Sequence, residues 1–242
     1  MSEQQITVWL AGDSTVQNCP EGYAPMAGWG QAFHLLFKPE VRIVNRAIGG
    51  RSTKSFIAEG RLEEILSEIV ENDWLLIQFG HNDEKLEGAY ADPNGMYKAY
   101  LKMYIDGARE KGAFPILITP VSRRLFDRNG RILDTHGAYR DAAISLGDEL
   151  DVPVIDLCTR SRALLEELGP DESKKLFLFL ERGVYPNYPE GSKDNTHFSQ
   201  EGAYAFAKLV AQGIREVPLP LYRLLLKLPP ENIHILSEAK PR

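Results

Sequence analysis

Hydrophobic positions along the chain alternate between short continuous runs and stripes with helical spacing. Apolar runs typical of β-strands occur at residues 6–10, 41–45, 74–79, 114–119 and 152–156. The run at 74–79 is almost wholly apolar, as expected for a strand covered on both faces. Helical spacing predicts helices at residues 29–37, 61–70, 97–111, 137–150 and 199–217. This alternation, without internal repeats, predicts one βαβ-type α/β domain over residues 1–242.

The segment 218–242 departs from this pattern. It surrounds the apolar run Leu224-Leu225-Leu226 with five prolines: Pro218, Pro220, Pro229, Pro230 and Pro241. We expect a C-terminal extension that packs on the domain, because chain termini are often tied down in this way. The alternative is a contact with a partner subunit in a homodimer.

Polar residues with chemical potential follow three of the predicted strands. Gly12-Asp13-Ser14 ends the first strand, the glycine loop with Gly49 and Gly50 follows the second, and Gly80-His81-Asn82-Asp83 follows the third. In open α/β sheets, ligands bind beyond these carboxyl ends. Ser14 is placed there as a nucleophile, while backbone N–H groups of the glycine loop and the amide of Asn82 are suited to stabilise an oxyanion. Each segment alone is equally consistent with a turn or a helix cap.

A fourth segment, Asp194-Asn195-Thr196-His197, precedes the last predicted helix. Imidazole is the natural base for a serine hydroxyl, because its ordinary pKa lies near neutrality. A carboxylate three residues away can hold that imidazole in the correct tautomer and stabilise its cation. Alone, the pair is equally consistent with a helix N-cap beside a solvated histidine. The coincidence of all four segments is far harder to explain by such local roles.

Taken together, these four segments resemble the four ordered blocks of the SGNH hydrolases, also called the GDSL lipase/esterase superfamily. The resemblance identifies Ser14 as nucleophile, Asp194 and His197 as acid and base, and Ser14, Gly50 and Asn82 as oxyanion donors. Thr15 stands where leucine is usual in the first block. The family implies a flavodoxin-like three-layer α/β/α sandwich with five parallel central strands. No G-x-S-x-G elbow is present, which counts against an α/β-hydrolase fold.

Finer features resemble the rhamnogalacturonan acetylesterase subgroup. They are Gly12-Asp13-Ser14-Thr15-Val16, Gly28-Trp29-Gly30-Gln31, Gly50-Arg51-Ser52, Phe79-Gly80-His81-Asn82-Asp83 and Asp194-Asn195-Thr196-His197-Phe198. This resemblance implies a serine esterase that removes O-acetyl groups from pectic oligosaccharides through an acyl-enzyme. Arg51, His81 and Trp29 are the expected substrate contacts, and a place in the core is the alternative for Trp29. The alternatives are an acetylesterase on xylan or another acetylated sugar, a lipase or thioesterase, or a carbohydrate-binding protein on the same fold.

Composition narrows the class of partner. The formal net charge of -6 argues against nucleic acid and anionic membrane surfaces, which attract clustered Lys and Arg. No stretch approaches the roughly 18 apolar residues of a membrane span. The first residues contain neither a basic segment nor a long apolar region, so we expect no signal peptide and a cytoplasmic protein.

The five histidines are scattered, so no metal or other cofactor is expected. Cys19 and Cys158 are interpreted as two idle thiols, with a single bridge as the alternative.

Overall fold

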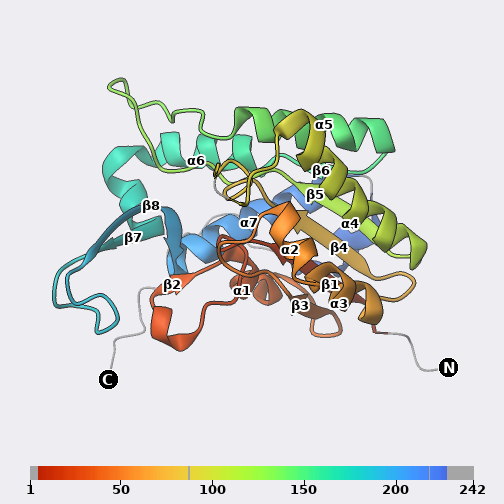
Figure 1. Ribbon diagram of the computed structural model, residues 1–242. Coiled ribbons are helices and arrows are strands. Elements are labelled where there is room, and N and C mark those ends of the chain that lie inside the picture. Colours follow the sequence, from red (N-terminus) through yellow and green to blue (C-terminus); the bar gives the residue numbers. More distant parts are fainter. Residues whose placement is uncertain (1–4, 87, 218, 228–242) are drawn as a thin grey trace.

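Five parallel strands form the central sheet of the computed structural model, which describes residues 5–86, 88–217 and 219–227 (Figure 1). Their order across the sheet is β3-β1-β4-β5-β6. The bounds are β1 Thr7–Gly12, β3 Arg42–Asn45, β4 Trp74–Gln78, β5 Phe114–Ile118 and β6 Val154–Ile155. Each predicted strand is present, with ends displaced by up to two residues. The order is that of the flavodoxin-like fold, so the predicted fold class is confirmed.

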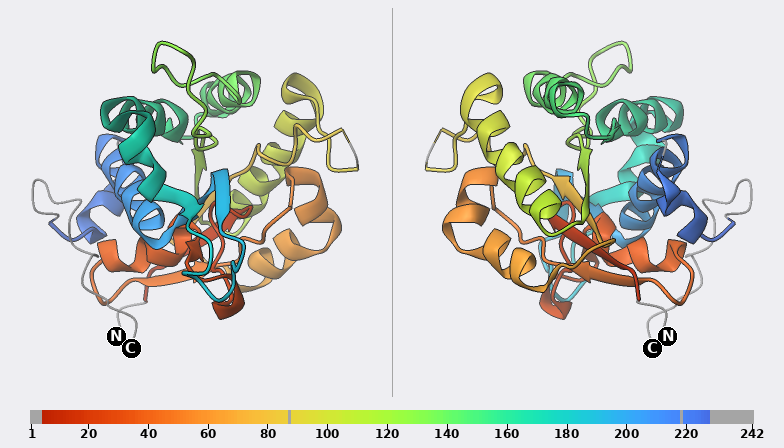
Figure 2. Two further views of the ribbon diagram at one scale, coloured as in Figure 1. Left: turned by 90° about the vertical axis from the view of Figure 1, so that its left-hand side faces the viewer. Right: turned by 90° about the vertical axis from the view of Figure 1, so that its right-hand side faces the viewer.

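Helices cover both faces of this sheet, as the edge-on views of Figure 2 show. Alternate residues of a strand point to opposite faces. Accordingly, Val8 and Leu10 of β1 join one hydrophobic cluster, and Trp9 and Ala11 join the other. The first cluster packs under α1 (Trp29–Ala32), α6 (Leu157–Glu172) and α7 (Gln200–Glu216). The second packs under α2 (Thr53–Ala58), α3 (Arg61–Glu68), α4 (Lys98–Glu110) and α5 (Gly137–Leu150).

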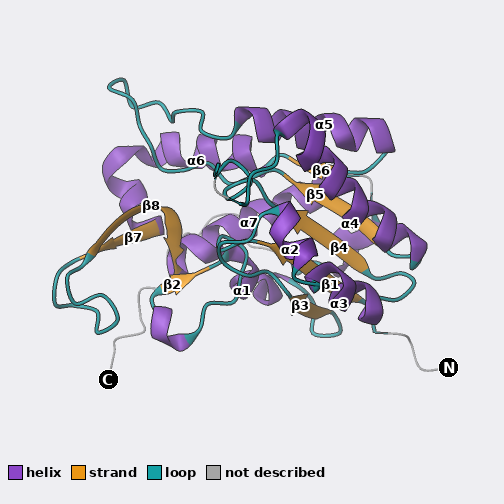
Figure 3. Ribbon diagram, in the orientation of Figure 1, coloured by secondary structure: helices purple, strands orange, loops and turns teal. Residues whose placement is uncertain are grey.

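A second, smaller sheet was not predicted. It is antiparallel, with the order β2-β8-β7, and is drawn in orange on the left of Figure 3. Its strands are β2 (Met26–Ala27), β7 (Phe177–Leu180) and β8 (Ser192–Ser199). Residues 194–197 therefore lie on a strand. The cap of the following helix is Ser199, whose side chain accepts a hydrogen bond from the N–H of Gly202, so the helix-cap alternative for Asp194 and His197 is wrong.

The helix predictions were only partly correct. The predicted helix at 29–37 is instead α1 followed by a 3₁₀ turn at Phe33–Leu36. Helix α6 was missed, although Leu157, Cys158 and Leu165 form a buried stripe along it. Gly169 interrupts that element with φ 72° and ψ 178°, so a second helical segment begins at Pro170. Shorter elements are the 3₁₀ turns Glu21–Tyr23, Ser173–Leu176 and Pro220–Leu224 and a π-helical turn at Pro93–Tyr97.

Part of the predicted C-terminal extension packs on the first hydrophobic cluster. Leu221 and Leu225 are buried in that cluster. The Lys38 N–H donates to the Leu224 carbonyl at 2.9 Å, and the Leu226 N–H donates to the Leu36 carbonyl at 2.9 Å. Residues 218 and 228–242 of the extension lie outside the described residues, and a homodimer contact through it stays a prediction. Both cysteines, Cys19 and Cys158, are free thiols.

Candidate active site

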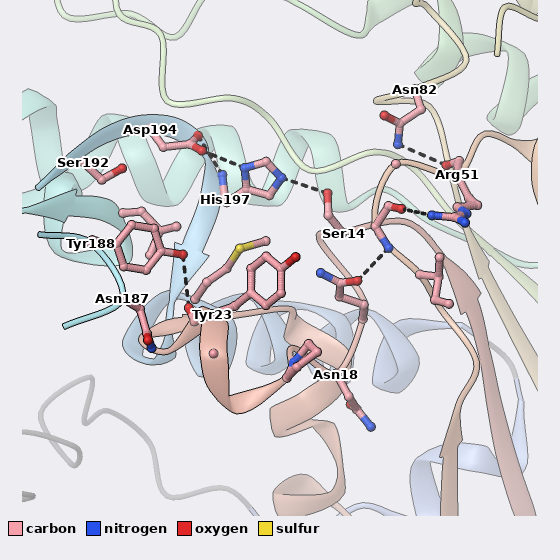
Figure 4. A pocket seen from close by; sticks show the side chains of 18 of the residues that line it. Ser14, Asn18, Tyr23, Arg51, Asn82, Asn187, Tyr188, Ser192, Asp194 and His197 are labelled. Atoms are coloured by element: carbon pink, nitrogen blue, oxygen red, sulfur yellow. Dashed lines mark hydrogen bonds and ion pairs between the residues drawn. The ribbon is translucent and has the colours of Figure 1, made fainter. Parts of the chain in front are cut away.

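The loops after β1, β3 and β4 meet strand β8 around one pocket of about 890 Å³ (Figure 4). Parallel strands present all their carboxyl ends at one edge of the sheet, which is why loops far apart in sequence converge here. Ser14, Gly50, Arg51, Asn82, Asp194 and His197 line this pocket. The structure therefore brings together six of the residues that the motifs singled out.

Ser14 lies in a turn that directly follows β1. The N–H groups of Val16 and Gln17 both donate to the Asp13 carbonyl at 3.1 Å. The side chain of Asp13 is buried, and its Oδ1 accepts hydrogen bonds from the N–H (2.9 Å) and the hydroxyl (2.8 Å) of Thr15. These bonds hold the backbone on both sides of Ser14, so its hydroxyl has a defined position at the pocket.

The segment Gly28-Trp29-Gly30-Gln31 supports this turn from behind. A Cβ on Gly28 would lie 2.4 Å from the Gln17 carbonyl oxygen, and one on Gly30 would lie 2.4 Å from the Val16 carbonyl oxygen. Only glycine permits so close an approach of the two backbones. The Trp29 N–H donates to the Thr15 carbonyl at 2.8 Å. We infer that this motif acts as a support for the serine turn.

Ser14, His197 and Asp194 form a continuous hydrogen-bonded chain, marked by dashed lines in Figure 4. His197 Nε2 lies 3.0 Å from Ser14 Oγ, and His197 Nδ1 lies 2.7 Å from Asp194 Oδ2. Because a carboxylate can only accept, the tautomer that fits carries its proton on Nδ1 and leaves Nε2 to accept from the serine hydroxyl. This is the arrangement needed for a histidine to deprotonate a serine.

Asp194 is held as an anion by its surroundings. Burial would raise its pKa, but hydrogen bonds from the His197 ring and from the N–H groups of Thr196 and His197 outweigh burial and lower the pKa to about 2. The carboxylate thus stabilises the fold above about pH 4, and this contribution is lost as the pH falls toward 2. It is charged throughout the range in which a histidine base works.

Strand β8 is fastened in place by Arg124, which sequence reasoning missed. The Arg124 N–H donates to the Asn195 carbonyl at 2.8 Å, and its guanidinium donates to Asn195 Oδ1 at 2.8 Å. A further guanidinium hydrogen bond reaches Ser173 Oγ. Phe198, also on β8, is buried in the first hydrophobic cluster. No local pattern marks Arg124, because its partners lie about 50 or more residues away along the chain.

Two groups in the pocket are suited to stabilise an oxyanion, beside the backbone N–H of Ser14. Gly50 has φ +80°, a left-handed conformation that favours glycine, in a loop that borders the pocket. The neighbouring N–H of Gly49 is already used, since it donates to Gln17 Oε1 at 2.6 Å. Asn82 is almost fully buried, and its Nδ2 donates one hydrogen bond to the Arg51 carbonyl at 3.1 Å.

Of the three predicted substrate contacts, only Arg51 lines the pocket. Its guanidinium is already engaged: Nε lies 3.1 Å from both carboxylate oxygens of Glu59, and Nη1 donates to the Gly49 carbonyl. For Trp29 the structure favours the core alternative, because this side chain is 1% exposed and its indole N–H donates to Gln78 Oε1. His81 does not line the pocket either, since its ring is buried against His136, with centroids 4.3 Å apart.

The opposite wall of the pocket comes from a hairpin that the sequence did not reveal. Between β7 and β8, the chain carries Asn187 and Tyr188 back to the segment around Tyr23 (Figure 4). Asn187 Nδ2 donates to the carbonyls of Glu21 (3.1 Å) and Ala24 (3.0 Å). The Tyr188 hydroxyl donates to the Tyr23 carbonyl at 3.1 Å. These contacts join segments more than 160 residues apart into one wall.

A second buried carboxylate, Asp83, lies directly after Asn82. Its Oδ1 accepts from the N–H and the hydroxyl of Thr53, which opens helix α2. Burial raises the pKa of Asp83 to about 7, against the effect of these hydrogen bonds. The folded protein therefore holds a proton here that the unfolded chain releases near pH 4. Stability contributed by this proton is lost as the pH rises from about 4 to about 7.

Asp83→Asn should remove this loss, because an amide stays neutral at every pH. We expect the free energy of unfolding of the variant, relative to the wild type, to rise by up to about 1.4 kcal/mol per pH unit between pH 4 and pH 7. Urea unfolding across that range measures it. Asp141→Asn on the exposed face of α5 is the matched control. Parallel pH profiles for Asp83→Asn and wild type would contradict a protonated Asp83.

Within residues 5–86, 88–217 and 219–227, no group of three or more His, Cys, Asp or Glu side chains is placed to hold a metal ion. Among the helices in the same ranges, none is both long and apolar enough to cross a membrane.

A sequence profile of the GDSL-like Lipase/Acylhydrolase family matches residues 10–205. This range contains every strand-end loop of the pocket and strand β8. The chain belongs to the GDSL-like lipase/acylhydrolase family. Membership confirms the resemblance drawn from the four motifs and, with it, the prediction of a carboxylic ester hydrolase.

Individual relatives of the GDSL-like family agree with this assignment. The chain is 53% identical over 221 residues to rhamnogalacturonan acetylesterase RhgT of Bacillus subtilis, covering 91% of this chain and 94% of that protein. It is 43% identical to the probable rhamnogalacturonan acetylesterase YesY of the same organism, covering 91% and 97% respectively. A crystal structure of Bacillus subtilis YxiM superposes with a TM-score of 0.75 at 29% identity, covering 88% of this chain and 57% of that longer one.

Proposed function

We propose that this protein is a serine acetylesterase that removes O-acetyl groups from rhamnogalacturonan oligosaccharides. The observation that carries the reaction type is the hydrogen-bonded chain from Ser14 through His197 to Asp194, which borders a pocket with oxyanion donors. The substrate rests on the similarity to relatives that are named rhamnogalacturonan acetylesterases.

In the first half of the proposed reaction, Ser14 Oγ attacks the carbonyl carbon of the acetyl ester while its proton passes to His197 Nε2. The carbonyl oxygen becomes an oxyanion, which the backbone N–H groups of Ser14 and Gly50 and the amide of Asn82 stabilise. Collapse of this intermediate breaks the bond to the sugar oxygen, which takes the proton from Nε2 and leaves as a hydroxyl. Acetyl remains on Ser14 as an ester.

In the second half, a water molecule gives its proton to His197 Nε2 and attacks the acetyl carbonyl carbon. The same oxyanion donors act again. The bond from the acetyl carbon to Ser14 Oγ breaks, the proton returns to that oxygen, and acetate leaves. Asp194 keeps His197 oriented through both halves and stabilises its cation, which is why an anionic partner with a lowered pKa is useful here.

The lining of the pocket is consistent with a carbohydrate ligand. Tyr23 and Tyr188 supply aromatic surface, and Asn18, Asn187 and Ser192 add polar side chains to the lining. Aromatic rings with a polar tip suit a ligand that presents both apolar and hydroxyl faces.

Acetate release from acetylated rhamnogalacturonan oligosaccharides, compared with acetylated xylan oligosaccharides, tests this proposal. We expect release that depends on Ser14 and is faster on the pectic substrate. Equal or faster release from xylan would retain the mechanism but reject the substrate. If folded protein released acetate from neither substrate and did not hydrolyse an aryl acetate, the proposed esterase would be rejected in favour of a carbohydrate-binding protein.

A further inference from the structure

The amide of Asn82 is fixed from both ends. Its Nδ2 donates to the Arg51 carbonyl at 3.1 Å, as Figure 4 shows, and its Oδ1 accepts from Lys85 Nζ at 2.6 Å. A primary amide has two N–H donors and one oxygen acceptor. With one N–H and the oxygen occupied, the second N–H is the group that Asn82 has left for a ligand.

A backbone turn places Lys85 beside the side chain of Asn82. The Lys85 N–H donates to the Asn82 carbonyl at 3.1 Å, which closes a turn over residues 82–85. Within the turn, the Asp83 carbonyl accepts from the Ala91 N–H at 3.0 Å and from the Tyr139 hydroxyl at 3.0 Å. The side chain of Asp83 is bonded to Thr53, as described above. The turn is thus attached to α2, to α5 and to the chain at Ala91. The packed core therefore fixes the backbone position of Lys85.

The two cations of the pocket differ in their ion pairs. Arg51 is paired with Glu59 through both carboxylate oxygens. For Lys85, which also lines the pocket, no carboxylate lies within ion-pair distance among the described residues. Its ammonium group therefore acts on the Asn82 oxygen without a neutralising carboxylate among residues 5–86, 88–217 and 219–227.

This contact has two consequences for the amide. Reversing the side chain of Asn82 would set its NH₂ group against an ammonium that can only donate, so the observed orientation is enforced. A charge-assisted hydrogen bond to the oxygen also draws electron density from the amide, which makes its remaining N–H a stronger donor. Both effects favour an anion at the place where the carbonyl oxygen of an ester gains charge.

We propose that Lys85 is a positioning residue of the oxyanion hole, acting through Asn82 rather than on the substrate itself. This inference rests on the proposed esterase function but not on which acetylated sugar is cleaved. The competing role for Lys85 is direct binding of a substrate carboxylate, such as that of a uronic acid. The two roles differ in whether the loss of Lys85 slows the hydrolysis of an uncharged ester.

A double-mutant cycle on a neutral aryl acetate separates them. We expect Lys85→Met to lower kcat about tenfold with KM nearly unchanged, and Asn82→Ala to lower kcat about 100- to 1000-fold. If Lys85 acts only through Asn82, then adding Lys85→Met to Asn82→Ala should cost nothing further. Lys85→Arg, which retains a charged donor, should recover part of the loss. Lys54→Met, an exposed lysine on α2, controls for the change in net charge.

Other outcomes overturn the inference in distinguishable ways. Equal fold losses from Lys85→Met in the wild-type and Asn82→Ala backgrounds would reject a role through Asn82. A loss confined to uronate-containing substrates and expressed in KM would assign Lys85 to substrate binding instead. Thermal unfolding of each variant separates either result from misfolding. Absence of Ser14-dependent turnover in the wild type would reject the proposed function and this role with it.

Discussion

Ser14→Ala is expected to abolish almost all ester hydrolysis, with a loss in kcat on the order of a millionfold, as for removal of the nucleophile in other serine hydrolases. The reason is geometric. Ser14 Oγ is the hydroxyl that lies 3.0 Å from His197 Nε2, and its turn is held by Asp13 and Thr15 on either side. Without Oγ, no acyl-enzyme forms. Residual turnover would come only from water activated by His197 in the presence of the oxyanion donors.

The measurement is kcat for an aryl acetate and for the acetylated oligosaccharide, with Ser67→Ala as the matched control. Ser67 lies on the exposed face of α3, and its hydroxyl donates to the Glu64 carbonyl of the same helix. Mass spectrometry after reaction with an organophosphonate should place the adduct on Ser14 in the wild type. Near wild-type turnover by folded Ser14→Ala would mean that the nucleophile has been misassigned.

Asp194→Asn should reduce kcat by about 10⁴-fold while leaving the fold intact. An asparagine oxygen can still accept from the N–H groups of Thr196 and His197, which now bond to Asp194 Oδ1. Its NH₂ group would then face His197 Nδ1, which must become an acceptor. The ring proton moves to Nε2, so His197 can no longer accept from Ser14, and the anion that stabilises the imidazolium is gone.

This substitution should act on kcat more than on KM, because ground-state binding does not require a charged His197. Asp171→Asn, at a strongly exposed position in the Leu157–Glu172 element, is the control for loss of a carboxylate. The folded state is checked by circular dichroism and thermal unfolding. If Asp194→Asn retained more than about a tenth of wild-type kcat, the imidazole would need no anionic partner and the proposed role of Asp194 would be rejected.

Much of the fold could be predicted from local patterns. Buried parallel strands require continuous apolar runs, and the five runs mark all five strands of the central sheet to within two residues. The predicted bounds of helix α5, residues 137–150, are the observed ones, because its apolar face repeats at helical spacing. Strands β2 and β8 carry no such signal, because β2 is short and β8 is polar. Strand β7 lies in an apolar run at residues 176–180 that was not among the predicted strands. The pairing of these three strands depends on contacts with distant segments.

Some positions around the pocket could likewise be predicted from the sequence, and others could not. Ser14 and Asn82 follow strands of one parallel sheet, so the order of strands and loops was enough to predict that they share an edge. His81 is the residue before Asn82 and Trp29 lies in the motif that supports the Ser14 turn, yet both side chains are buried. Neighbourhood in sequence predicts which loop a residue belongs to. It does not predict toward which side of that loop the side chain points.

By itself, the sequence determined the parallel sheet, the family and the residue types gathered at the carboxyl ends of the strands, because each is written in local periodicity or short motifs. Only the tertiary structure decided that Arg51 is paired with Glu59, that Lys85 bonds to Asn82 and that Tyr188 returns to Tyr23. The physical reason is that the direction of a side chain and the identity of its partner depend on packing. Tyr188 and Tyr23 are 165 residues apart, and even Lys85 and Asn82, which are three residues apart, meet only because the packed core fixes the turn between them.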